Sequence, residues 1–277
     1  MNRVAIFGVG LIGGSFALAL RKAGFQGEIA GVSSPRTIET ALSLGVIDRG
    51  LSAIEAAATC DLIYLSQPIL TILETLDTIG PHIRSGALVT DAGSTKRLIA
   101  DKGYLALRQG FFLGGHPMAG KETSGVREAE ADLFLRRTYV LTPREMSDME
   151  RPEFIEFRGW VEKIGAKVVC LQPEEHDHLV AFTSHVAQLV STALACTVGD
   201  VNGHDLVAGP GIIGLTRLAM SPYNVWSDIL RTNRQNIDDA LGALLSKLSR
   251  LREKVGTGDL EEDFRRAAEV SRHLREN

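Results

Sequence analysis

The chain has 277 residues, enough for one or two domains with a sizeable core, and a formal net charge of −4 from 30 basic and 34 acidic residues. It has no basic run of the kind that binds nucleic acid or anionic lipid, and no apolar stretch that approaches the roughly 18 residues of a membrane span. Three widely spaced cysteines argue against a disulfide framework, and the first segment lacks a signal-peptide layout. These properties favour a soluble enzyme or binding protein of the cytoplasm.

Short apolar runs alternate with helical patterns over residues 1–172. Most of these runs lack a regular alternation of apolar and polar residues, as strands buried on both faces of a parallel sheet do. The pattern therefore predicts a doubly wound, Rossmann-type α/β domain over residues 1–172. The expected strands are Arg3–Phe7, Glu28–Val32, Asp61–Ser66, Ala87–Asp91, Gly110–Leu113, Thr138–Leu141 and Ala166–Leu171.

The first expected strand runs directly into a glycine loop. Gly8, Gly10 and Gly13 have the G-x-G-x-x-G spacing, and a helical pattern opens at Leu11 and Ile12. In this context the first glycine permits a tight turn, the second lets a pyrophosphate approach the backbone, and the third allows close packing. The helix start would add free N–H groups and a positive dipole end. The loop predicts a dinucleotide site, and a ligand-free glycine turn is the alternative.

The residues after the second expected strand bear on the choice of dinucleotide. NAD-binding units commonly have Asp or Glu there to bind the ribose 2′-hydroxyl, but this chain has Ser33. Ser33, Ser34 and the guanidinium of Arg36 can donate to a 2′-phosphate, which a carboxylate would repel. We therefore predict NADP as the preferred cofactor, with NAD as the second choice. Alternatively, Ser34 only caps the next helix and Arg36 is a solvated surface charge.

Two further strand ends are expected at the same edge of the sheet, where such domains bind their ligands. One carries Ser66, Gln67 and Pro68, and the next carries Asp91, Ser94 and Lys96 within TDAGSTK. We expect the first three residues and Asp91 to lie near the cofactor. The GST segment also suits a simple helix cap.

A single histidine, His116, follows the next expected strand within GGHPMAG, residues 114–120. An imidazole suits a general base because its ordinary pKa lies near working pH. The alternative is a polar residue that merely ends a strand.

The chain changes character after Gln172, where the strand patterns stop. One long apolar helix is expected from Pro173 to about Gly199, and another from about Asn233 to Val255, before a charged final helix. We therefore predict an all-α domain over residues 173–277. Apolar residues of the second long helix step by four and three, forming a seam that either packs within the domain or is shared across a dimer. These residues, called the seam below, are Ile237, Leu241, Leu244, Leu248, Leu251 and Val255.

Three histidines of the first long helix, His176, His178 and His185, lie close together in the sequence. The first two point to different helix faces, and no cysteine joins them. We therefore expect no metal site.

Five segments occur in the order found in proteins similar to prephenate and arogenate dehydrogenases, the TyrA family: GVGLIGGS, DAGSTK, GGHPMAG, EEHDHLVAFTSH and TRLAMSPYNVW. The resemblance covers nearly the whole chain, and the histidine and late arginine motifs are specific to the family. From this resemblance, together with the patterns and the seam described above, we predict a Rossmann-type domain followed by an all-α C-terminal dimerisation domain, in a homodimer. The resemblance also implies NAD(P)-dependent oxidative decarboxylation of prephenate or arogenate in tyrosine biosynthesis. Hydride leaves the ring carbinol carbon, carbon dioxide departs as the ring becomes aromatic, and the product is 4-hydroxyphenylpyruvate or tyrosine.

The resemblance also assigns roles to individual residues. His116 matches the catalytic base that takes the proton of the ring hydroxyl, and Ser94 matches the serine that orients this histidine. Arg217 matches an arginine that holds a substrate carboxylate, for which a bidentate guanidinium is suited. The other residues implied at the substrate site are Glu122, His185, Gln188 and Trp226. His185 and Trp226 suit the core of a helical domain equally well.

Two departures from the family pattern affect the substrate site. Many relatives have Phe-Arg-Asp shortly before the Thr-Arg pair, where this chain has Ile212, Ile213 and Gly214. Some prephenate-using members have a second histidine where this chain has Gln188, so the choice between prephenate and arogenate stays open. Two other functions also remain open: a dehydrogenase for a modified prephenate in a side branch, and a non-catalytic NADP-sensing protein.

Overall fold

The computed structural model describes residues 1–121 and 123–276, and the predicted substrate residue Glu122 lies outside them. The described residues form an eight-stranded sheet in the order β3-β2-β1-β4-β5-β6-β7-β8. The order reverses beside β1, as in doubly wound folds, so the expected α/β architecture is confirmed. The strands are β1 (Arg3–Phe7), β2 (Glu28–Val32), β3 (Arg49–Gly50), β4 (Leu62–Leu65), β5 (Leu88–Asp91), β6 (Phe111–Pro117), β7 (Thr138–Thr142) and β8 (Lys167–Cys170).

One side of the sheet departs from the expected parallel arrangement. β6 and β7 pair antiparallel, with His116 opposite Val140. β6 also continues past its expected end at Leu113 to Pro117, so His116 lies inside a strand rather than after one. The backbone on both sides of this histidine is therefore held by the sheet.

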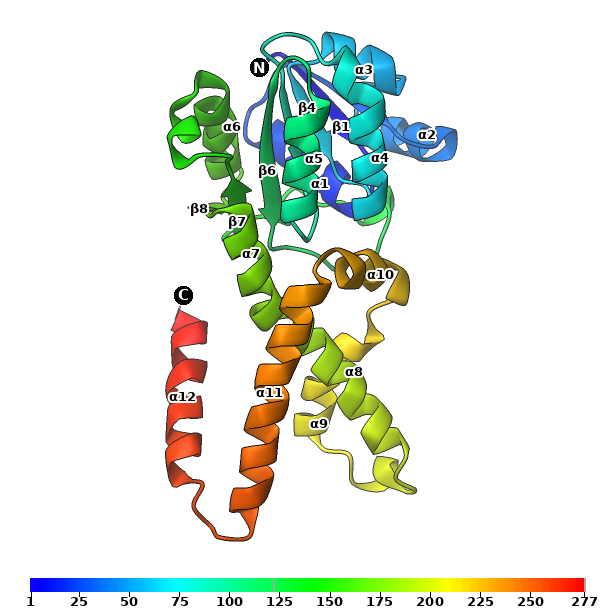
Figure 1. The fold of residues 1–277 in the computed structure, drawn as a ribbon. Helices are drawn as coiled ribbons and strands as arrows, with labels where there is room; N and C mark the ends of the chain where they lie inside the picture. Colours follow the sequence, from blue (N-terminus) through cyan, green and yellow to red (C-terminus); the bar gives the residue numbers. More distant parts are fainter. Residues whose placement is uncertain (122, 277) are drawn as a thin grey trace.

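Helices cover both faces of the sheet (Figure 1). α1 (Leu11–Lys22) and α6 (Pro152–Lys163) pack on one face, where the ring of Phe16 stacks on Tyr64 at a centroid distance of 4.0 Å. α3 (Ala53–Thr59), α4 (Ile69–Ile79) and α5 (Arg97–Ala106) pack on the other face, and α2 (Pro35–Ser43) contacts β3. Both faces of the sheet are therefore apolar and covered by helices. Polar ligand-binding groups are expected at the edge formed by the carboxyl ends of the strands.

The rest of the chain is helical and extends away from the sheet (Figure 1). Its elements are α7 (Pro173–Val180), a π-helical turn η4 (Ala181–His185), α8 (Val186–Gly199), η5 (His204–Val207), α9 (Pro210–Leu215), η6 (Arg217–Met220), α10 (Tyr223–Thr232), α11 (Arg234–Val255) and α12 (Glu261–Glu276). α10 docks on the sheet domain, because Ile229 belongs to the same core as α4 and Asp228 accepts a hydrogen bond from the N–H of Leu70 at 3.1 Å.

The continuous helix from Pro173 to Gly199 corrects one expectation. By length and composition it is apolar enough to cross a membrane, and 33% of its most apolar window is buried. However, the buried polar residues His176, Asp177, His185 and Gln188 lie along it. Its apolar residues Ala181 and Val186 pack against α11 in a separate core. We therefore assign the helix to the helical domain, where one side of it packs against α11.

The seam on α11 divides into two parts. Ile237 is buried, and Leu241 and Leu244 pack against the same core as Val186. Leu248 and Val255 are 50% and 69% exposed, on the part of α11 that runs beside α12. Packing within the domain thus accounts for Ile237, Leu241 and Leu244, and in part for Leu251, which lines a cavity between α11 and α12.

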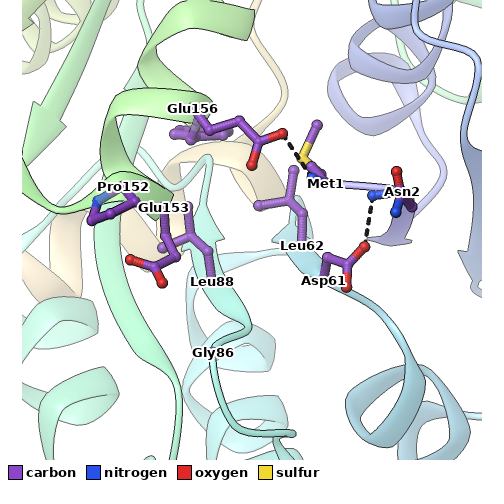
Figure 2. A pocket seen from close by; sticks show the side chains of 10 residues that line it. Met1, Asn2, Asp61, Leu62, Gly86, Leu88, Pro152, Glu153 and Glu156 are labelled. Atoms are coloured by element: carbon purple, nitrogen blue, oxygen red, sulfur yellow. Dashed lines mark hydrogen bonds and ion pairs between the residues drawn. The ribbon is translucent and has the colours of Figure 1, made fainter.

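A cavity of about 300 Å³ lies at the amino ends of β1, β4 and β5 (Figure 2). The terminal ammonium of Met1 donates to Glu156 at 2.7 Å, and Asp61 accepts from the N–H of Asn2 at 2.6 Å. Ligands of such sheets bind at the opposite edge, at the carboxyl ends of the strands. We therefore assign these contacts a structural role: they hold the start of β1 against α6 and against the start of β4.

Candidate active site

The glycine loop between β1 and α1 leaves its backbone open to a ligand. Gly8 has φ +84°, and a Cβ there would lie 2.9 Å from the carbonyl oxygen of Ser66. A Cβ on Gly13 would collide with the Ser66 side chain and with β1, whereas a Cβ on Gly10 would meet nothing within 4 Å. The glycines therefore perform the three tasks predicted: turn, open approach and close packing.

The start of α1 provides hydrogen-bond donors. Gly10 is the N-cap and no side chain caps the helix. The N–H groups of Leu11 and Ile12 consequently have no acceptor within the helix. The side chains of Leu11 and Ile12 are partly buried against the core.

A cavity of about 590 Å³ surrounds this loop at the carboxyl ends of β1, β2 and β4. Its size and its open helix N-terminus fit the adenosine and pyrophosphate of a dinucleotide. The cavity is lined by Gly8, Val9, Gly10, Val32, Ser33, Ser34, Thr37, Ser66, Gln67, Pro68, Thr71, Gly125 and Val126.

Several of the predicted cofactor residues that line this cavity also make hydrogen bonds that stabilise the local fold. Ser34 caps α2, accepting from the N–H of Thr37 at 3.3 Å, and Arg36 beside it is exposed. The hydroxyl of Ser66 donates to the carbonyl oxygens of Phe7 and Gly8 and so holds the glycine loop on β4. Ser33 is exposed at the cavity and makes no such hydrogen bond among the described contacts.

Asp91, which is predicted to lie near the cofactor, stands at the end of β5, and its side chain has a structural role there. Its carboxylate is fully buried and forms an ion pair with Lys96, which is also fully buried. Burial raises the pKa of the Asp91 carboxyl and lowers the pKa of the Lys96 ammonium, while each charge opposes the shift of the other. The pair grips Gly115 from both sides: Asp91 accepts from its N–H at 3.2 Å, and Lys96 donates to its carbonyl oxygen at 2.7 Å. The pair thereby fixes the residue that precedes His116.

His116 is buried beside this pair and contacts a second histidine. Its Nδ1 lies 2.8 Å from Nε2 of His176 on α7, and the Nδ1 of His176 lies 2.8 Å from Asp177. Burial, with the positive charges that His176, Lys96 and His185 can carry, lowers the pKa of His116 well below 6.5. The ring is therefore neutral at physiological pH, as a general base must be. The residue at Nδ1 is His176 and not Ser94, which is half-buried on the turn before α5.

Other predicted substrate residues lie on the adjoining helices. His185 is buried in η4, 3.2 Å from the side-chain nitrogen of Asn233 and edge-on to the ring of Trp226 at 6.0 Å. Burial lowers the pKa of His185 to about 4. Gln188 is buried one turn further, and its Oε1 has no hydrogen-bond partner within residues 1–121 and 123–276. Arg217 is exposed at the start of η6, which packs against α8.

His176, Asp177 and Asn233 were missed as site residues by the sequence interpretation, which weighed His176 only as a metal ligand. The His-Asp pair in EEHDHL, inside a segment that carries the family resemblance, is the available signal. In the described part of the chain, no cluster of three or more His, Cys, Asp or Glu side chains has the geometry to hold a metal ion.

Comparison with known families agrees with this geometry. A model of the "prephenate dehydrogenase, nucleotide-binding domain" matches residues 16–170, and one of the "prephenate dehydrogenase, dimerization domain" matches residues 172–269. The chain belongs to the prephenate dehydrogenase family. The expected fold class, a Rossmann-type domain followed by a helical dimerisation domain, is confirmed for this member of the family.

Relatives of this prephenate dehydrogenase family member span almost the whole chain. A prephenate dehydrogenase of Bacillus subtilis is 35% identical over 274 residues, which are 95% of this chain and 73% of the relative. The structure of Aquifex aeolicus prephenate dehydrogenase with hydroxyphenyl propionate and NAD⁺ matches with a TM-score of 0.89 and 32% identity, over 100% of this chain and 98% of the other. Synechocystis arogenate dehydrogenase matches with a TM-score of 0.82 and 29% identity, over 99% of both chains.

Proposed function

We propose that the protein is an NAD(P)-dependent prephenate or arogenate dehydrogenase of tyrosine biosynthesis. The observation that carries the proposal is the buried, neutral His116 at the same edge of the sheet as the open glycine loop. Its Nδ1 is engaged by His176, so Nε2 is the ring atom left for a substrate. Relatives named prephenate, cyclohexadienyl and arogenate dehydrogenase support the substrate class.

The chemistry divides between the cofactor and the protein. The nicotinamide, when bound, supplies the hydride acceptor. His116 Nε2 takes the proton of the ring hydroxyl as the carbinol carbon is oxidised to a carbonyl. The ring carboxylate then leaves as carbon dioxide, and its electron pair completes the aromatic ring as a phenolate. The phenolate oxygen takes the proton back from His116, giving 4-hydroxyphenylpyruvate from prephenate or tyrosine from arogenate. Burial of His116 keeps its lone pair available at neutral pH.

The test is purified protein with each substrate and each cofactor, followed by the absorbance of the reduced cofactor. Turnover with prephenate or arogenate supports the proposal. Dinucleotide binding without turnover of either substrate would instead favour a sensing protein or an enzyme for a modified prephenate.

We propose that Arg217, together with Glu122, His185, Gln188 and Trp226, binds the substrate, and that Arg217 pairs with a carboxylate. Arg217→Ala should then raise KM by about 10- to 150-fold, since a charge-assisted contact contributes about 1.5–3 kcal/mol. Arg158→Ala, which removes an exposed arginine paired with Glu162 on α6, is the matched control. An Arg217→Ala enzyme with the KM of the wild type would remove Arg217 from the substrate site.

We further propose that NADP is preferred over NAD. Ser33 lines the cavity at the end of β2, where a carboxylate would favour NAD, and Arg36 brings positive charge to the start of α2. Ser33→Asp should shift the ratio of kcat/KM toward NAD by at least about tenfold, or about 1.4 kcal/mol. Arg36→Ala should weaken NADP alone. Equal losses with both cofactors for Arg36→Ala would show that this arginine does not meet the 2′-phosphate.

We also propose that the chain has two domains, residues 1–172 and 173–277. We propose that the protein is a homodimer held together by the second domain, and that it is located in the cytoplasm. The exposed part of the seam and the apolar residues of α12 are the surface that a second copy would cover. Leu248→Lys should raise the dimer dissociation constant at least about tenfold by sedimentation equilibrium, because it places a charge in that surface. Leu105→Lys, at a residue 85% exposed on α5, is the control. A wild-type chain that stays monomeric at all concentrations would contradict the dimer.

A further inference from the structure

Three buried side chains connect the sheet to the helical domain in an unbroken line of hydrogen bonds. Asp177 Oδ1 lies 2.8 Å from His176 Nδ1, and His176 Nε2 lies 2.8 Å from His116 Nδ1. The two imidazole rings meet at 71°, with their centroids 5.0 Å apart. Both nitrogens of His176 and the Nδ1 of His116 have a defined neighbour, so the position of each proton can be worked out.

The line is anchored at its Asp177 end. The N–H of Lys96 donates to Asp177 Oδ1 at 2.7 Å, and the N–H of Arg97 donates to Oδ2 at 3.0 Å, both at the start of α5. Asn233 donates to the backbone carbonyl of Asp177 at 2.7 Å. The carboxylate is therefore fixed against the same turn that carries Lys96.

The order of donors follows from this anchor. A carboxylate only accepts, so the Nδ1 of His176 must carry a proton and donate it to Asp177. Burial lowers the pKa of His176, so its ring is neutral. Because Nδ1 carries the proton, Nε2 has a free lone pair. That lone pair accepts from His116, so the proton of the neutral His116 ring resides on Nδ1. The lone pair of His116 is then on Nε2.

We infer that His176 and Asp177 are positioning residues that set the tautomer of His116. Resting on the proposed function, this inference explains how the base holds its lone pair toward the ring hydroxyl before substrate arrives. A neutral imidazole carries its proton on one nitrogen and its lone pair on the other. The hydrogen bond made by one nitrogen therefore decides whether the other can accept a proton. In serine proteases, a carboxylate sets the tautomer of the catalytic histidine. Replacing that carboxylate gives the wrong tautomer and lowers kcat by about 10⁴-fold.

Two substitutions at His176 separate this role from simple packing. His176→Phe keeps a ring of similar size but removes the acceptor. His176→Gln places an amide oxygen near the position of Nε2 and keeps an acceptor. We expect His176→Phe to lower kcat at least about tenfold with little change in KM or in cofactor binding, and His176→Gln to recover most of that loss.

The direct readout is the ¹⁵N imidazole spectrum of the histidine-labelled full-length chain with oxidised cofactor bound, because it distinguishes Nδ1–H from Nε2–H rings. The chain has seven histidines, so the His116 signals are identified as those absent from His116→Asn. We expect Nδ1–H for His116 in the wild type and in His176→Gln, and loss of this single tautomer in His176→Phe.

Two results would overturn the inference: a wild-type His116 protonated on Nε2, or a folded His176→Phe enzyme with kcat within about threefold of wild type. If His176→Phe does not fold, the wild-type spectrum decides alone. Because that spectrum requires no turnover, an enzyme inactive on prephenate and arogenate would contradict the proposed function without deciding the tautomer.

Discussion

Replacing His116 with asparagine should lower kcat by about 10²- to 10⁴-fold, the usual cost of removing a general base. The asparagine side chain lacks a basic lone pair and is small enough for the buried position on β6. Dinucleotide affinity should stay close to wild type, because the cofactor cavity is lined by the glycine loop, β2 and the segment after β4. Stopped-flow turnover and titration calorimetry with the cofactor measure the two quantities separately.

The control is His82→Asn, at an exposed histidine after α4, which should leave both quantities unchanged. A His116→Asn enzyme with turnover within about threefold of wild type would show that another group takes the proton. A loss of cofactor affinity equal to the loss of kcat would point to a misplaced sheet edge instead of a lost base.

The pH profile gives an independent view of the same residue. The proposed base His116 would act in its neutral form, and burial holds its pKa well below the ordinary 6.5. The acidic limb of kcat/KM should therefore fall below pH 6.5, and activity should persist as the pH is lowered through the ordinary histidine range. A limb above pH 6.5 would contradict a buried, neutral His116 in the free enzyme.

Lys96→Met should destabilise the protein by about 3–5 kcal/mol, because it leaves the Asp91 carboxylate buried without its partner. The loss is large since neither side chain is exposed to water that would solvate the remaining charge. Urea denaturation followed by circular dichroism measures it. The double variant Asp91→Leu/Lys96→Met should recover much of the stability, because it buries no unpaired charge.

Lys102→Met is the control for Lys96→Met. Lys102 pairs with Asp77 at 2.5 Å on the partly exposed surface between α5 and α4, and such pairs contribute about 0–1 kcal/mol. If Lys96→Met cost no more than Lys102→Met, the buried pair would not be what holds Gly115 and the strand before His116.

Local patterns in the sequence predicted much of the architecture. β1 and β2 begin and end at the expected residues, because each is a buried apolar run bounded by polar residues or glycine. The helix at 173–199 and α11 also appear at the expected places. The glycine loop was predictable because its spacing, its strand and its helix are all contiguous in the chain.

Features that depend on contacts between distant segments were not predictable in this way. Neither the sequence of β6 nor that of β7 contains a pattern that indicates their antiparallel pairing. Asp91 stands at a strand end, where ligand contacts are common, and only the fold shows that Lys96 occupies its carboxylate. The approach of His176 to His116 spans 60 positions and depends on α7 returning to the sheet edge.

The most direct test of the proposed reaction is its stoichiometry. The purified chain is incubated with prephenate or arogenate, carboxyl-labelled on the ring, and with NADP or NAD. Released carbon dioxide and reduced cofactor are then counted in the same sample, with wild type and His116→Asn in parallel. The proposed chemistry predicts equal amounts of the two products from the wild type and a matching loss of both in His116→Asn. Reduced cofactor formed without carbon dioxide, or neither product from either substrate, would contradict it.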